Sequence, residues 1–143
     1  MQDQFMLSAW VRYGEHKTLK DCRLPGIYVL AHFKKPPVST ASVTSKEVIY
    51  IGETTGQDIA KRLYQFGRSA FKRLPAHSGG WRYSDEFLGS SEIDQPPNNL
   101  YVSIMGVNQS DTEQATVYIK YLERSAIWLF FQKNKSLPRC NAA

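Results

Sequence analysis

The stretches GIYVLAHF (residues 26–33) and KEVIYIGETTG (residues 46–56) decide the fold that this sequence predicts. Both are rich in the β-branched and aromatic residues that favour strands. The segment between them, 34–45, carries two adjacent prolines and several hydroxyl residues, which is typical of a solvated loop. We therefore expect strands over 26–33 and 46–52, joined as an antiparallel hairpin. A third apolar run, 100–107, follows the turn-forming QPPNN and predicts another strand.

Two segments carry the apolar spacing of amphipathic helices. Within 57–74 the apolar stripe consists of Ile59, Leu63, Phe66, Ala70 and Leu74, with Arg62 at its edge. Within 111–133 the stripe consists of Ala115, Ile119, Leu122, Ala126 and Leu129, with Glu123 on its margin. Asp111 and Gln114 have the spacing of a capping box at the start of this second helix.

The remaining segments predict less regular structure. A short helix is expected around 5–13, and 76–99 is expected to be rich in loops, with a short element around 81–88. We expect at least one aromatic residue of that element, among Trp81, Tyr83 and Phe87, to lie in the core. The sequence thus predicts a single α+β domain over 1–143, with an antiparallel sheet of about three strands flanked by helices.

Composition narrows the class of protein. The 143 residues carry a formal charge of +5, which favours polyanionic partners such as nucleic acid. The positive residues gather in two groups: Lys61, Arg62, Arg68, Lys72, Arg73 and Arg82, and then Lys133, Lys135 and Arg139. Neither a long apolar run nor a signal peptide is present, so we expect a cytoplasmic or nucleoid-associated protein with no membrane partner. Cys22 and Cys140 fit no disulfide framework or zinc spacing, and we expect both to be reduced.

The tripeptides Gly26-Ile27-Tyr28 and Tyr50-Ile51-Gly52 resemble the two half-motifs of the GIY-YIG nuclease superfamily. In that superfamily the second half-motif precedes a helix with an arginine, a strand, a helix with a glutamate, and an asparagine shortly after a proline. This chain has Arg62, Glu123 and Asn141 in that order. The resemblance covers about residues 25–141 and implies a small GIY-YIG-like nuclease domain.

The resemblance implies a metal-dependent endonuclease that hydrolyses DNA phosphodiester bonds. Glu123 would hold one Mg²⁺ or Mn²⁺ ion, because hard cations prefer oxygen ligands. Arg62 would bind the phosphate, since its planar fork matches the oxygens. Tyr28 would be the base or the water-orienting group, with Tyr50 assisting, and a base near neutrality needs a depressed pKa. Asn141 would fix the geometry of the site.

Two positions depart from the family pattern. Phe66 stands where many members have a histidine or tyrosine, and Glu53 stands where some have a lysine. Either Tyr28 carries the base duty, or His77 in HSGG supplies a base, or the enzyme is weak or altered. His77 is equally explained as a histidine of a surface loop. Glu53 would repel the phosphate or be a surface residue, and no second acidic residue lies at helical spacing beside Glu123.

Several features concern partners. Arg68, Lys72 and Arg73 would form a track for the DNA backbone, although a solvated helix face explains them equally well. Because one site cuts one strand, double-strand cleavage would need a homodimer or two sequential events. The alternatives are a non-catalytic nucleic-acid-binding module that keeps the fold, and a structure-specific or RNA-directed nuclease. Specificity would come from 1–22, 34–45 or 76–99.

Overall fold

A four-stranded antiparallel sheet forms the centre of the computed structural model, which describes residues 4–143. The strands are β1 (Val11–Arg12), β2 (Gly26–His32), β3 (Val48–Thr54) and β4 (Leu100–Gly106). Their order across the sheet is β1-β4-β2-β3, so that β3 is an edge strand. The predicted α+β class, the three predicted strands and the antiparallel pairing of the first two are confirmed.

The segment expected to form a helix around 5–13 does not do so. Val11 and Arg12 pair instead with Val102 and Tyr101 of β4, and a 3₁₀ helix, η2 (Tyr13–Thr18), follows. The free edge of β4 offers these residues backbone hydrogen bonds that an isolated short helix cannot match. The helical interpretation was therefore wrong because long-range pairing outweighs local pattern.

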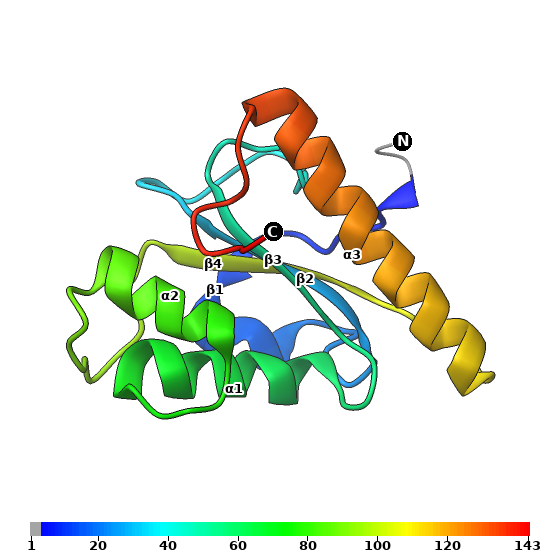
Figure 1. Cartoon of the computed structure of the whole chain (residues 1–143), viewed down its shortest axis with the longest axis horizontal. Helices are drawn as coiled ribbons and strands as arrows, with labels where there is room; N and C mark the ends of the chain where they lie inside the picture. The colour runs from blue at the N-terminus through cyan, green and yellow to red at the C-terminus, as the bar shows by residue number, and fades with distance from the viewer. Residues whose placement is uncertain (1–3) are drawn as a thin grey trace.

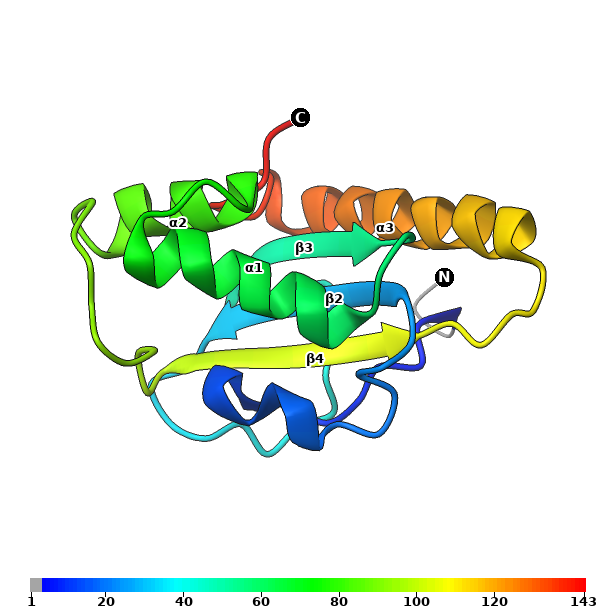
Figure 2. The same cartoon turned by 90° about the horizontal axis from the view of Figure 1, so that it is seen from below.

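Helices cover both faces of the sheet (Figures 1 and 2). The helices α1 (Ile59–Lys72) and α2 (Ser78–Phe87) pack on one face, and α3 (Thr112–Asn134) crosses the other. The alternation of side chains along β2 explains this layering. Tyr28 and Leu30 join the core on the α1 side, whereas Val29 and Ala31 join the core beneath α3.

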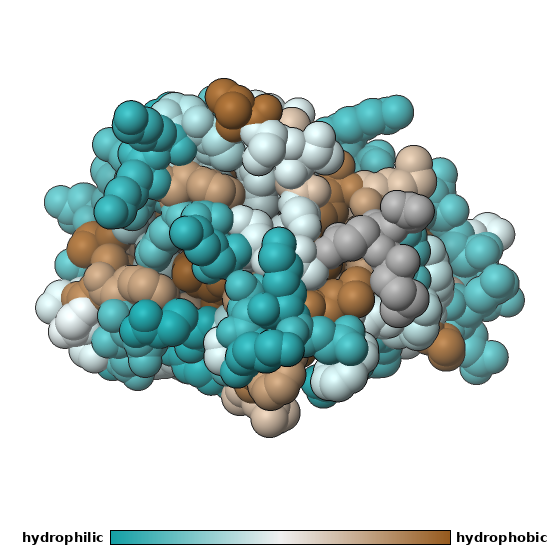
Figure 3. All heavy atoms as spheres, turned by 90° about the horizontal axis from the view of Figure 1, so that it is seen from above, coloured by the Kyte–Doolittle hydropathy of each residue, from teal (hydrophilic) through white to brown (hydrophobic). Residues whose placement is uncertain are grey.

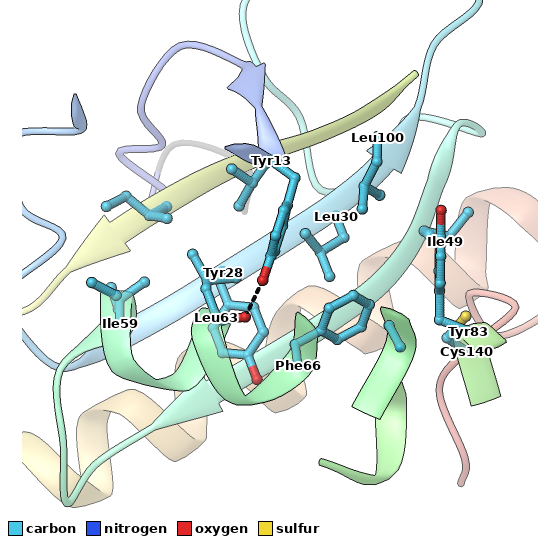
Figure 4. Close-up of a cluster of buried hydrophobic side chains, with 14 of the residues drawn as sticks. Tyr13, Tyr28, Leu30, Ile49, Ile59, Leu63, Phe66, Tyr83, Leu100 and Cys140 are labelled. Carbon is cyan, nitrogen blue, oxygen red and sulfur yellow. Dashed lines mark hydrogen bonds between the residues drawn. The ribbon is translucent and has the colours of Figure 1, made fainter. Parts of the chain in front are cut away.

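The predicted helix signals are mostly confirmed. The Asp111 side chain accepts a hydrogen bond from the Gln114 amide at 3.0 Å and caps α3, and Asp58 caps α1 in the same way. The first four residues of the α1 stripe are buried, and Figure 4 shows Leu63 and Phe66 against Tyr28. Leu74 is 38% exposed because α1 ends at Lys72. Leu129 of the α3 stripe is half-buried.

The segment 76–99 contains a full helix that begins earlier than expected. Gly79 and Gly80 lie in the first turn of α2 and are buried. A Cβ at Gly80 would lie only 2.5 Å from the backbone oxygen of Phe66, so glycine here permits α2 to pack against α1. Tyr83 of this helix is fully buried, which confirms that one of its aromatic residues belongs to the core.

The C-terminal segment returns along the outer edge of β3. The Cys140 amide donates a hydrogen bond to the Ile49 oxygen at 2.8 Å. Cys140 and Cys22 are both free and buried. Seen from above the view of Figure 1, the surface is mainly hydrophilic with separate apolar patches (Figure 3). Within residues 4–143, no helix combines the length and the hydropathy needed to cross a membrane.

Candidate active site

The two tyrosines of the doubled motif lie side by side on one face of the sheet. Tyr28 stands opposite Gly52 in the β2–β3 ladder, and the ring centroids of Tyr28 and Tyr50 are 6.0 Å apart. A Cβ at Gly52 would lie 2.6 Å from Cζ and Oη of Tyr28 and 2.6 Å from Cε2 of Tyr50. Glycine at this position therefore leaves the space that the two rings occupy.

The two hydroxyl groups differ in their access to solvent. Tyr28 has no exposed surface, whereas Tyr50 is only partly buried. Burial is the main cause that raises the pKa of each phenol, and the charge of Arg62 opposes it in both. The pKa depression expected for a tyrosine base is thus not found, and both hydroxyls are protonated at neutral pH in the protein without ligands.

Two arginines from different helices approach Tyr50. Arg62 of α1 donates hydrogen bonds from Nη1 to Oε1 of Gln65 at 2.9 Å and to the Ala76 oxygen at 3.3 Å. Arg82 of α2 donates from Nη1 to the Cys140 oxygen at 3.2 Å. The positive charges of both lower the pKa of Tyr50. Sequence reasoning placed Arg82 only in a basic cluster, because nothing in the sequence shows that α2 packs beside the tyrosines.

Glu123 and Glu53 form an acidic pair next to the tyrosines. The Glu123 side chain is 19% exposed, and its Oε1 lies 3.6 Å from Nε of Arg124. Burial raises the pKa of Glu123, and the charge of Glu53 raises it further. Glu123 in turn raises the pKa of Tyr50. The carboxylate of Glu123 therefore acts on the same hydroxyl as the two arginines.

The sequence left open that Glu53 is a surface residue, and it showed no acidic residue at helical spacing beside Glu123. In the structure Glu53 is partly buried and lies close enough to Glu123 to raise its pKa. It lies on β3, is partly buried, and its Oε2 is buried without a hydrogen-bond partner among the described residues. An unpaired buried carboxylate oxygen beside a second carboxylate fits a hard divalent cation. Across residues 4–143, no group of three or more His, Cys, Asp and Glu side chains gathers as a metal site. A cation here would have these two carboxylates and otherwise water as ligands.

His77 is buried rather than placed on a surface loop. It is 3% exposed and is the N-cap of α2, where its Nδ1 accepts a hydrogen bond from the Gly80 amide at 3.2 Å. Its Nε2 lies 2.7 Å from the Tyr28 hydroxyl oxygen. Burial, followed by the charges of Arg62 and Arg82, lowers the pKa of His77 to about 3. The imidazole is therefore neutral at neutral pH, and the surface-loop interpretation was wrong.

Phe66 forms part of the wall behind the tyrosines. Its ring centroid lies 5.4 Å from that of His77 and 6.2 Å from that of Tyr50. The phenylalanine is fully buried and offers no proton-transfer group. The imidazole of His77, the N-cap residue of α2, nevertheless contacts the hydroxyl of Tyr28.

Asn141 acts on the backbone of β3. Its Oδ1 accepts a hydrogen bond from the Ile51 amide, and its Nδ2 donates one to the Ile51 oxygen, each at 2.9 Å. The side chain thereby continues the ladder on the open edge of β3. Because Ile51 stands between Tyr50 and Gly52, Asn141 holds the strand that carries the site.

The expected DNA track is only partly available. Arg73 stacks on Trp81, with its Cζ 4.1 Å from the ring centroid, and pairs with Asp85 at 2.8 Å. Lys72 donates a hydrogen bond from Nζ to the Ile93 oxygen at 2.9 Å, while its side chain stays exposed. Arg68 is exposed and donates to the Tyr64 hydroxyl at 3.2 Å. Lys72 and Arg68 thus remain accessible to a polyanion, whereas Arg73 stabilises the packing of α2 on α1.

The β3–α1 turn adds a polar pocket beside the site. The pocket has a volume of about 420 Å³ and is lined by residues 53–57 together with Lys61 and Arg62. Comparisons of the chain with protein-family models, with curated proteins and with solved structures found no match. What the chain does must therefore be inferred from these residues and their geometry.

Proposed function

We propose that the protein is a metal-dependent endonuclease of the GIY-YIG type that hydrolyses DNA phosphodiester bonds. The observation that carries this proposal is the convergence of opposite charges on the Tyr50 hydroxyl. Arg62, Arg82 and Glu123 come from three different helices, and each changes the pKa of that hydroxyl. Hydrolysis of a phosphodiester needs such a combination, with cations for the phosphate, a carboxylate for a metal ion, and a hydroxyl beside the attacking water.

The arginines would hold the scissile phosphate. Both side chains are partly exposed and are anchored by hydrogen bonds to backbone oxygens, Arg62 to Ala76 and Arg82 to Cys140. Anchored guanidinium groups lose little side-chain freedom when a phosphate binds, and their forks match its oxygens. Asn141 would keep β3 in register so that the tyrosines meet the same phosphate.

The acidic pair would hold the metal. Glu123 and Glu53 would bind one Mg²⁺ or Mn²⁺ ion, which when bound supplies Lewis-acid stabilisation of negative charge on the phosphate. Glu123 is the principal ligand in this proposal, and the unpaired Oε2 of Glu53 gives it a second donor. The residues of this chain then exclude water on the buried side through Tyr28, His77 and Phe66.

DNA is the proposed partner, and the formal charge of +5 favours its binding. The exposed Arg68 and Lys72 would contact the phosphate backbone. By the resemblance, the products would carry 5′-phosphate and 3′-hydroxyl ends. Cleavage of both strands would use two copies of the chain or two successive events, and such an enzyme would act in the cytoplasm or at the nucleoid.

A second candidate is a nucleic-acid-binding module without catalysis. Phe66 in place of a titratable residue and the raised pKa values of both tyrosines favour it, because neither tyrosine is ionised at neutral pH. A nuclease directed to branched DNA or to RNA would use the same groups on another substrate.

Cleavage assays with matched variants separate these proposals. Wild type, Glu123→Gln and Glu113→Gln are incubated with supercoiled plasmid, branched DNA and single-stranded RNA in Mg²⁺ or Mn²⁺. Glu113 is an exposed glutamate in the first turn of the same helix and serves as the control. We expect wild type and Glu113→Gln to cut DNA, and Glu123→Gln to lose at least about a hundredfold in rate. A wild-type protein that retards DNA on a gel but never cuts it would establish the binding module instead.

A further inference from the structure

We propose that the exposed face of α3 is the surface through which two copies of this chain pair, with the two helices antiparallel and the two-fold axis beside Arg124. The inference rests on the proposed function in one respect, because it supplies the second copy that cleavage of both strands would use. The pairing itself needs no nuclease activity and is tested without it.

Helix α3 lies on the outside of the sheet and carries large apolar side chains on its outer face (Figures 1 and 2). Four of them are each between 42% and 66% exposed: Val117, Tyr121, Trp128 and Phe131. The rings of Trp128 and Phe131 stack with their centroids 6.4 Å apart, so they present one continuous apolar surface. An exposed apolar patch of this kind marks an interaction site on an otherwise hydrophilic protein.

The outer side chains of α3 follow the spacing of a seam between two helices. The buried residues Leu122 and Ala126 lie on the opposite side of the helix. A repeat of 3.5 residues keeps one stripe of a helix turned toward a partner helix along its length. Steps of four and three residues alternate along the outer stripe, which consists of Val117, Tyr121, Arg124, Trp128, Phe131 and Lys135. We call this stripe the α3 seam.

The two ends of the α3 seam differ in shape. A hollow of about 550 Å³ lies at the first end, where its lining includes Val117, Tyr118 and Tyr121. The stacked rings of Trp128 and Phe131 lie at the other end. Antiparallel pairing places the two rings of each copy over the hollow of the other, as knobs enter holes between packed helices.

The charges of the α3 seam favour a second copy in the antiparallel orientation. Residues equally far from Arg124 face each other in such a pair. Val117 and Phe131 are each seven positions away, and the exposed Glu113 and Lys135 are each eleven positions away. Apolar side chains thus meet apolar ones, and a carboxylate meets an ammonium group at both ends. A parallel pair would bring like charges together. Such self-complementarity is what a two-fold dimer requires.

Arg124 lies at the centre of the α3 seam and would lie close to Arg124 of the second copy. Its Nε is 3.6 Å from Oε1 of Glu123, so each guanidinium group has a counter-charge from its own chain. Tyr121 and Trp128 of the second copy flank it in the antiparallel register, and a guanidinium group stacks favourably on such rings. The two like charges at the axis are thereby compensated.

The pairing would bring the two candidate sites to one side of the dimer. Glu123 directly precedes Arg124 and so lies about 100° around the helix from it, on a flank of the α3 seam. On this flank it changes the pKa of Tyr50. A two-fold axis between antiparallel helices is perpendicular to both, so equivalent flanks stay on the same side. One DNA duplex would then meet both sites, one on each strand.

Analytical ultracentrifugation without DNA tests the pairing. One chain has a mass of 16.3 kDa, and we expect wild type to approach twice this mass. Because a single helix pair is a small interface, the rise is expected between about 1 and 300 µM. We expect Trp128→Ser to raise the dissociation constant at least about tenfold. The control Tyr64→Ser changes an exposed tyrosine of α1 and is expected to leave it unchanged. Circular dichroism checks that both variants fold. A wild type that stays at 16.3 kDa, or a Trp128→Ser variant that pairs as wild type does, overturns the proposal.

Charge reversal tests the antiparallel register. We expect Glu113→Lys and Lys135→Glu each to weaken pairing at least about fivefold at low ionic strength, because like charges then meet at both ends. The double variant Glu113→Lys/Lys135→Glu restores opposite charges at both ends and is expected to pair nearly as wild type does. A parallel pair would not respond in this way. A double variant that pairs no better than the single variants therefore overturns the proposed arrangement.

Plasmid cleavage separates the pairing from the nuclease function. At concentrations that form the dimer, we expect wild type to linearise supercoiled plasmid and Trp128→Ser to give mainly nicked circles, since nicking needs only one copy. If wild type pairs but no form of the protein cuts DNA, the nuclease function fails and the pairing stands. If wild type is monomeric and Trp128→Ser binds DNA more weakly, the α3 seam binds nucleic acid and the proposal is overturned.

Discussion

Removal of the Asn141 side chain tests how the edge of the sheet is held. In Asn141→Ala, the amide and the oxygen of Ile51 lose the two hydrogen bonds, each of 2.9 Å, that the Asn141 side chain makes with them. A net contribution of about 1 kcal/mol per hydrogen bond gives an expected loss of about 2 kcal/mol in the free energy of unfolding. Ile51 has no exposed surface, so water compensates the orphaned groups poorly.

Urea denaturation followed by circular dichroism measures this loss, and amide hydrogen exchange of Ile51 reports it locally. Asn141→Asp keeps an acceptor for the Ile51 amide but turns an oxygen toward the Ile51 oxygen, so we expect a comparable or larger loss. The control is Asn108→Ala, an exposed asparagine after β4, with an expected change within about 0.5 kcal/mol. If Asn141→Ala is as stable as this control and Ile51 exchanges as in wild type, then Asn141 does not hold β3.

Three further predictions concern the interior of the site. Gly52→Ala would force a methyl group to within 2.6 Å of Tyr28. We expect the free energy of unfolding, measured by urea denaturation, to fall by about 1–3 kcal/mol, and the Tyr28 ring to be displaced in a crystal structure. An unchanged ring position would contradict the packing described. His77 is neutral in the folded protein down to a pKa of about 3 but protonates near 6.5 when unfolded, so wild-type stability falls as pH falls through this window. In His77→Asn we expect up to about 1.4 kcal/mol per pH unit of that slope to disappear, and equal slopes would count against a buried neutral imidazole. Glu53→Gln removes a negative charge from beside Glu123, so we expect the Glu123 pKa to fall in a ¹³C NMR titration. We also expect Mn²⁺, followed by its EPR signal, to bind more weakly. An unchanged Glu123 pKa would show that the two carboxylates do not interact.

Elements with a strong periodic pattern could be predicted from the sequence. The strands after Pro25 and Lys46 and the two long amphipathic helices carry their own signals, since burial on one face forces a regular spacing of apolar residues. The two-residue strand β1 has no such signal, because it forms only where β4 offers it an edge. The start of α2 was missed for another reason. Two glycines disfavour a helix locally, and only the contact with α1 explains them.

The candidate site shows the same division. An ordered motif pointed to Tyr28, Tyr50, Arg62 and Glu123. The fold places Arg62 and Glu123 close enough to Tyr50 that both change its pKa. Arg82 could not be chosen, because no local pattern records which helix packs beside the tyrosines. The pairing of Glu53 with Glu123 was missed since the sequence was searched for acidic residues at helical spacing, whereas one carboxylate comes from a strand.

The C-terminal segment that lies along β3 also has a consequence for the order of events during synthesis. Cys140 and Asn141 are translated after every helix and strand of the sheet, yet they occupy the outer hydrogen-bonding groups of Ile49 and Ile51. Until they emerge from the ribosome, β3 exposes an unpaired edge to other nascent chains. The strand that carries Tyr50 thus gains its outer hydrogen bonds only when this segment docks.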